Sequence, residues 1–147
     1  MQVEKIVDDL LNRFNQLVVK KTWGETSLFF NPKGASAHGS YFLTIKESDG
    51  ENDQASNLDR DGVFRVSFGV SRISYEALFG PKPPRPAKGG VVKTGHDFTQ
   101  TDLLMPHPIY AWMHWVQVLN PSQETWNSNQ NLIQESYDLS KARFEKK

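Results

Sequence analysis

The chain contains no cysteine, which excludes disulfide frameworks, thiolate catalysis and cysteine-ligated zinc sites. Lysine plus arginine and aspartate plus glutamate number 17 each, so the chain also lacks the basic excess typical of proteins that bind phosphate backbones. No run approaches the roughly 20 apolar residues that a membrane span needs. The first six residues include charged ones, where a signal peptide requires an apolar run. We therefore expect a cytoplasmic protein with no membrane partner.

The chain has 147 residues, 37% of them hydrophobic and 12% aromatic, which predicts one domain over residues 1–147 with a core rich in rings. Apolar residues at helical spacing predict an amphipathic helix from Val3 to Val18. At the other end, Asn120-Pro121-Ser122-Gln123 is typical of a helix start with Asn120 as N-cap, and the predicted helix continues to about Phe144.

Short β-branched and aromatic segments between these helices predict strands at 27–30, 40–46, 63–70 and 115–119, the first two paired antiparallel. Ser71 is expected to cap a short helix that ends at Gly80. The turn at 31–34 has proline and glycine in the positions that a tight turn favours. This order of elements predicts an α+β fold, an antiparallel sheet with the N- and C-terminal helices packed on it.

Two long loops differ in charge. Residues 47–61 are acidic, without the glycine and closing glutamate of a calcium loop, so a solvated loop is favoured over a cation site. Within it, Arg60 is expected to form a salt bridge with Asp59 and Asp61. Residues 81–95 form a loop rich in proline and glycine, and its cations suggest an alternative function as a weak nucleic-acid binder. The predicted contacts are Lys82, Arg85, Lys88 and Lys93.

The stretch 103–120 concentrates aromatic residues and histidines, with two of the four tryptophans. These rings either fill the interface between sheet and helix or form the wall of a pocket for a small molecule or a peptide. We predict that the chain is a small binding or interaction domain whose partner is an unknown small molecule or protein. The predicted ligand-binding residues are His107, Tyr110, Trp112, His114 and Trp115, together with Arg65 of the third strand.

The histidines of this region raise the alternative of catalysis. Imidazole and carboxylate groups together favour a transition metal or acid–base chemistry, and His96, Asp97 and His107 are the candidate metal ligands. A metal-assisted hydrolase around His96, His107 and His114 is therefore a second alternative, although histidines in such a loop more often form local hydrogen bonds. There is no nucleophile elbow and no phosphate-binding glycine loop, and we predict no cofactor. His38, in a turn rich in glycine and serine, is expected at the surface.

Several blocks of the sequence resemble an uncharacterised bacterial family known only as a domain of unknown function. The blocks are LDRDGVFR at 58–65, GVS at 69–71, LFG at 78–80, LMPHPIYA at 104–111 and WVQVLNP at 115–121. More distantly, HWVQV at 114–118 followed by ESYDL at 135–139 resembles the closing strand and helix of MmcQ/YjbR-like proteins. That second resemblance implies a compact α+β double-wing fold, for which DNA binding has been suggested by analogy.

Overall fold

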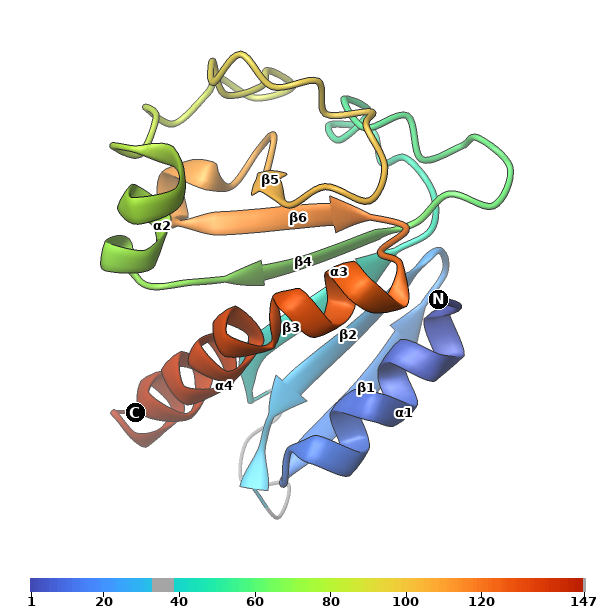
Figure 1. The fold of residues 1–147 in the computed structure, drawn as a ribbon, viewed down its shortest axis with the longest axis vertical. Helices are drawn as coiled ribbons and strands as arrows, with labels where there is room; N and C mark the ends of the chain where they lie inside the picture. Colours follow the sequence, from blue (N-terminus) through green and yellow to red (C-terminus); the bar gives the residue numbers. More distant parts are fainter. Residues whose placement is uncertain (33–38, 147) are drawn as a thin grey trace.

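The computed structural model describes residues 1–32 and 39–146 and has an α+β architecture, as the sequence predicts (Figure 1). Its described strands form one antiparallel six-stranded sheet in the order β1-β2-β3-β4-β6-β5. The strands are β1 (Leu17–Thr22), β2 (Glu25–Phe30), β3 (Ser40–Lys46), β4 (Arg65–Gly69), β5 (Met105–Pro106) and β6 (Trp115–Leu119). The helices are α1 (Val3–Arg13), α2 (Arg72–Phe79), the short 3₁₀ helix η2 (Ala111–Met113), α3 (Gln123–Ser128) and α4 (Gln130–Glu145).

The hydrophobic core lies between one face of the sheet and the terminal helices. Figure 1 shows α3 and α4 crossing the sheet, with α1 beside β1. The apolar face of α1 contributes Ile6 and Leu10 to the core, and the C-terminal helices contribute Trp126 and Ile133. The sheet contributes residues that alternate along its strands: Leu28, Leu43, Ile45, Val66, Phe68, Val116 and Val118. Alternation of this kind places one side chain in two on the buried face of each strand.

The N-terminal helix is shorter than predicted. It ends at Arg13, and Leu17 and Val18 belong to β1, which pairs with β2 through a hairpin closed at Gly24 (φ +73°). Gln16, with φ +64°, breaks the helical backbone between them. The helical spacing of apolar residues continues by coincidence into β1, where the β-branched pair Val18–Val19 favours a strand.

The C-terminal helix starts later than predicted and is divided. Ser122, not Asn120, is its N-cap, since the Ser122 hydroxyl accepts a hydrogen bond from Thr125 N at 3.1 Å. Asn120 instead joins two segments, accepting from Phe64 N and donating to Gly62 O, both at 2.8 Å. Asn129, with φ −102° and ψ 10°, separates α3 from α4.

Other local predictions are confirmed or refined. Ser71 caps α2, with Gly80 (φ +81°) at its end, and β3 pairs antiparallel with β2. The two-residue strand β5 lies in a segment for which the sequence predicted no strand. His38 and the second half of the predicted turn at 31–34 lie outside the described residues. Over residues 1–32 and 39–146, no helix combines the length and the apolar character that crossing a membrane requires.

Candidate functional site

The sheet face opposite the helices carries polar side chains. Strand register places Lys46 of β3 beside Arg65 of β4 and places Ser67 beside Gln117 of β6. Arg65, Ser67 and Gln117 are buried although they are polar. A buried polar surface of this kind is costly unless hydrogen bonds satisfy it, so the loops that cover it must supply partners.

A cavity of about 760 Å³ lies over this polar face. Its floor is formed by strands β2, β3 and β4, with Asp53 bound to β3 and β4 and His107 at its edge. Its sides are formed by the other residues of the loop segments 50–53, 85–90 and 107–113. Charged groups and aromatic rings both line the cavity, and ligand sites usually combine these two kinds of residue. They include Glu25, Tyr41, Thr44, Lys46, Glu51, Asp53, Arg65, Ser67, Arg85, Lys88, His107, Tyr110, Trp112 and Trp115.

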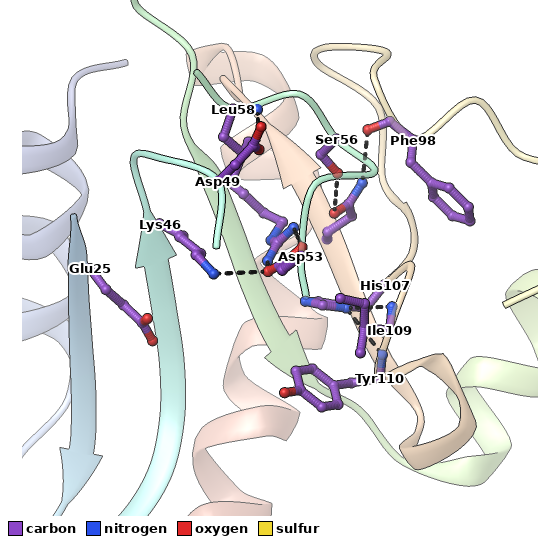
Figure 2. Close-up of polar contacts among 12 residues, drawn as sticks. Glu25, Lys46, Asp49, Asp53, Ser56, Leu58, Phe98, His107, Ile109 and Tyr110 are labelled. Atoms are coloured by element: carbon purple, nitrogen blue, oxygen red, sulfur yellow. Dashed lines mark hydrogen bonds and ion pairs between the residues drawn. The ribbon is translucent and has the colours of Figure 1, made fainter. Parts of the chain in front are cut away.

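Asp53 holds the charged part of the floor together. Its carboxylate accepts from Arg65 Nη1 at 3.0 Å and from Arg65 Nη2, and from Lys46 Nζ at 3.1 Å (Figure 2). Burial alone raises the pKa of Asp53, but the hydrogen bond and charge of Arg65, with the charge of Lys46, lower it from 3.8 to about 2. The Asp53 side chain is only 13% exposed, so the prediction that loop 47–61 is simply solvated is wrong at this residue.

Further hydrogen bonds hold loop 47–61 in shape and attach it to the sheet. Within the loop, Asp49 accepts from Leu58 N at 2.7 Å, and Ser56 Oγ donates to Gln117 Oε1 of β6 at 3.1 Å (Figure 2). Arg60 donates to the carbonyl groups of Ser56, Asn57 and Thr99, so the predicted salt bridge with Asp59 and Asp61 is wrong. Carbonyl groups of the folded loop are nearer partners for this guanidinium than its sequence neighbours.

His107 stands at the edge of the floor, where β5 ends. Its Nδ1 accepts hydrogen bonds from Ile109 N and Tyr110 N, both at 3.1 Å (Figure 2). An Nδ1 that accepts leaves the proton of the neutral ring on Nε2. Burial first, and then the charges of Arg65 and Lys46, hold the pKa of His107 well below 6.5, while Asp53 opposes them. At neutral pH the imidazole is therefore uncharged and has an Nε2–H to donate.

The aromatic wall follows directly after His107. The ring of Tyr110 lies 4.9 Å from the His107 ring, centroid to centroid. The guanidinium of Arg85 lies 4.7 Å from the centroid of Trp112, a cation–π arrangement at the cavity side. Trp115 packs close to the backbone of Gly69, where an added Cβ would lie 2.9 Å from Trp115 Nε1. By contrast, Trp126 fills the interface between sheet and helices.

The structure brings five of the six predicted ligand-binding residues to one cavity: Arg65, His107, Tyr110, Trp112 and Trp115. His114 does not line it. Its backbone is left-handed (φ +65°), and its ring lies 5.6 Å from that of Tyr75. Sequence reasoning missed Lys46, Asp53 and Ser67. The alternation of strand 63–70 was a usable signal for Ser67, because it places Ser67 on the same face as Arg65.

The candidate metal ligands are not assembled. His96 Nδ1 lies 2.8 Å from Thr94 Oγ1, and the Asp97 carboxylate accepts from the backbone and hydroxyl of Thr99. His107 Nδ1 is occupied by two backbone N–H groups. Across the described part of the chain, no three histidine, aspartate or glutamate side chains are close enough to hold a metal ion.

The cations of loop 81–95 are divided between two surroundings. Arg85 and Lys88 line the cavity, whereas Lys82 acts electrostatically on His114 and lowers its pKa, after burial. Lys93 is exposed and does not line the cavity. The four predicted nucleic-acid contacts therefore do not form one continuous basic surface around the cavity.

Comparison with known proteins matches residues 1–147 to a family of unknown function, DUF6194. The chain belongs to DUF6194. No curated protein and no solved structure matches it. Because the DUF6194 match covers the whole chain, it includes every element that forms the cavity.

Proposed function

We propose that this DUF6194 chain is a single α+β binding domain that holds a small molecule in the cavity over the polar sheet face. The observation that carries the proposal is the meeting of an aromatic wall, Tyr110, Trp112 and Trp115, with a charged, buried floor in one cavity. Its volume of about 760 Å³ lies within the range typical of ligand pockets, about 300–1,000 Å³. An apolar wall with a few fixed polar groups is the usual composition of such pockets.

The floor is suited to recognition because its groups are already ordered. Asp53 fixes both Arg65 and Lys46, and two backbone N–H groups fix the ring of His107. A ligand therefore meets side chains whose rotamers are set before binding, which lowers the entropy lost on association. This preorganisation supports a binding role.

The proposal is tested by filling the cavity. Thr44 lies on β3 in the cavity floor, and a Thr44→Trp side chain would occupy the space. Thr22→Trp is the matched control, because Thr22 is an exposed strand residue that does not line the cavity. Saturation-transfer NMR against a panel of neutral, anionic and cationic aromatic fragments measures binding to the unmodified protein and both variants.

We expect some fragments to bind the unmodified protein and Thr22→Trp, and the same fragments to lose their signal with Thr44→Trp. Thermal unfolding of each variant confirms that it is folded. Fragments that still bind Thr44→Trp, or a panel in which nothing binds the unmodified protein, would overturn the proposal.

A nucleic-acid function is the second candidate, and the double-wing resemblance implies it. The guanidinium of Arg85 lies over the indole of Trp112, and a cation beside an aromatic face is also a way to hold an unpaired base. The test is the retention of the protein on a polyanion column as salt increases. Retention that falls steeply with salt and is weakened in Arg85→Ala supports this candidate, whereas elution without retention removes it.

A further inference from the structure

Resting on the proposed function, we infer that the ligand of this cavity is a planar aromatic molecule that carries one anionic group. The anionic group lies on the floor formed by Lys46, Ser67 and His107, and the ring lies against the aromatic wall. The anionic group is a carboxylate or a phosphate ester, which share the chemistry of a compact anionic acceptor.

The floor offers hydrogen-bond donors. An ammonium group has three N–H donors, and Lys46 Nζ uses one of them on Asp53. Within the described residues, neither the Ser67 hydroxyl nor His107 Nε2 has a hydrogen-bond partner. The Asp53 carboxylate already receives two bonds from Arg65 and one from Lys46. A ligand that approaches the floor therefore meets donors in need of an acceptor.

The charges around the cavity favour an anion. In the floor, Arg65 and Lys46 are balanced by Asp53 and by Glu25, which lies opposite Lys46 in the strand register. At His107, burial first and then the positive charges of Arg65 and Lys46 lower the pKa, against the opposing effect of Asp53. Around the whole cavity, Lys46, Arg65, Arg85 and Lys88 face three carboxylates, those of Glu25, Glu51 and Asp53. A single anionic group balances this excess.

The aromatic part of the ligand follows from the wall. Tyr110 and Trp112 come from the loop that contains His107, and Tyr41 comes from the far end of β3. These rings line one cavity, and aromatic rings favour offset or edge-to-face contact with another ring. Arg85 adds a planar guanidinium on Trp112, which also stacks on aromatic ligands. A planar molecule uses these surfaces better than a branched aliphatic acid.

The test compares anions with uncharged counterparts of the same shape. The probes are benzoate, indoleacetate and adenosine monophosphate, and their counterparts are benzamide, indoleacetamide and adenosine. Dissociation constants are measured by titration calorimetry or ligand NMR at low and high salt. We expect at least one anion to bind the unmodified protein about tenfold or more tightly than its uncharged counterpart, as one charge-assisted hydrogen bond predicts.

Two substitutions in the floor test whether the floor causes the difference in affinity between an anion and its uncharged counterpart. Lys46→Gln removes the ammonium but leaves the Asp53–Arg65 pair, and we expect it to abolish most of the preference for the anion. Lys21→Gln is the matched control, because Lys21 is an exposed residue of β1 outside the cavity. Ser67→Ala removes a hydroxyl without a protein partner, so it is expected to fold normally and to weaken anion binding roughly threefold to tenfold.

Each result is decisive. Carboxylates or phosphate esters that bind alone identify which anionic group the floor accepts. Uncharged or cationic aromatics that bind as well as the anions, with binding lost in Thr44→Trp, overturn this inference and leave the proposed function standing. An anion preference that survives both Lys46→Gln and Ser67→Ala also overturns it, and a panel with no binding overturns the proposed function itself.

Discussion

The two faces of the sheet are both buried, yet they are buried in different ways. On the helix face, Leu28, Ile45 and Val66 are fully covered by apolar side chains. On the loop face, Arg65, Ser67 and Gln117 are covered as well, but the covering loops leave a cavity of about 760 Å³ above Arg65 and Ser67. Burial alone therefore does not distinguish a filled surface from one that leaves room for a ligand. The difference lies in whether the covering segment fills the space.

The comparison assigns stability to the helix face, and under the proposed function the loop face serves recognition. Side chains on the helix face contribute through packing, which is lost when a cavity is made. Groups on the loop face contribute through charge pairs and hydrogen bonds, which make their contribution dependent on pH. Substitutions on the two faces should therefore differ in both size and character.

The largest effect is expected at the centre of the helix face. Trp126 is buried, and its Nε1 donates to Asp9 Oδ2 at 2.8 Å, which connects α3 to α1. Trp126→Ala is expected to lower the free energy of unfolding by about 3–5 kcal/mol, measured by urea denaturation. Trp23→Ala is the control, because Trp23 is 93% exposed and its removal should change stability by less than about 0.5 kcal/mol. Similar losses for the two variants would contradict the assignment of the core.

On the loop face, the largest effect is expected at Asp53. Asp53→Asn leaves the buried Arg65 guanidinium without its counter-charge, which is expected to cost about 3 kcal/mol of unfolding free energy. Asp59→Asn, in the same loop and exposed, is the control. An Asp53→Asn protein as stable as the unmodified one would show that the pair does not hold the loop on the sheet.

The pKa of Asp53 gives the same interaction a pH signature. Because its folded pKa is lowered from 3.8 to about 2, its contribution is complete above about pH 4 and is lost as pH falls towards 2. The lowering corresponds to about 2 kcal/mol of stability. Urea denaturation between about pH 5 and pH 2 should therefore show a steeper loss for the unmodified protein than for Asp53→Asn.

His107 is expected to lower the stability of the protein at a higher pH than Asp53 does. Its folded pKa lies well below 6.5, so the unfolded chain takes up a proton first and stability falls as pH drops below 6.5. Urea denaturation at several pH values should therefore show the unmodified protein losing stability between pH 6.5 and about pH 5.5. In His107→Asn the amide oxygen replaces Nδ1 as acceptor for Ile109 N and Tyr110 N, so we expect the fold to be kept. Most of the slope of unfolding free energy against pH should then disappear. The remaining slope belongs to His114, whose pKa is also lowered, first by burial. An unchanged slope in His107→Asn would contradict a buried, neutral imidazole.

Local signals in the sequence were sufficient for most of the fold. Strands β3, β4 and β6 and the capped helix α2 follow from alternation and from Ser71 and Gly80, which act over a few residues. The hairpin of β1 and β2 was missed because Leu17 and Val18 fit two periodicities at once. Pairing with β2 in the folded protein makes these residues a strand, and the local sequence pattern does not reveal that pairing.

The candidate site was only partly predictable for the same reason. The concentration of rings in 103–120 pointed to Tyr110, Trp112 and Trp115 because they are neighbours in sequence. The pairing of Asp53 with Arg65 and Lys46 depends instead on how loop 47–61 returns over the sheet. A turn with hydrogen bonds between Gly50 and Asp53 sets that return, and acidic composition alone does not reveal it.

The smallest effect is expected at the exposed edge of the loop face, where the comparison is most sharply tested. Arg85→Ala removes the guanidinium over Trp112, and an exposed cation–π pair contributes only about 0.5–1 kcal/mol to stability. The change in tryptophan emission should nevertheless be clear, and it should vanish when Arg85→Ala is made together with Trp112→Phe, since the two side chains act as a pair. Lys93→Ala, an exposed cation of the same loop outside the cavity, should change neither quantity. A loss at Arg85 as large as that at Trp126 would mean that the loop is part of the core, and the distinction between a filled face and an open one would fail.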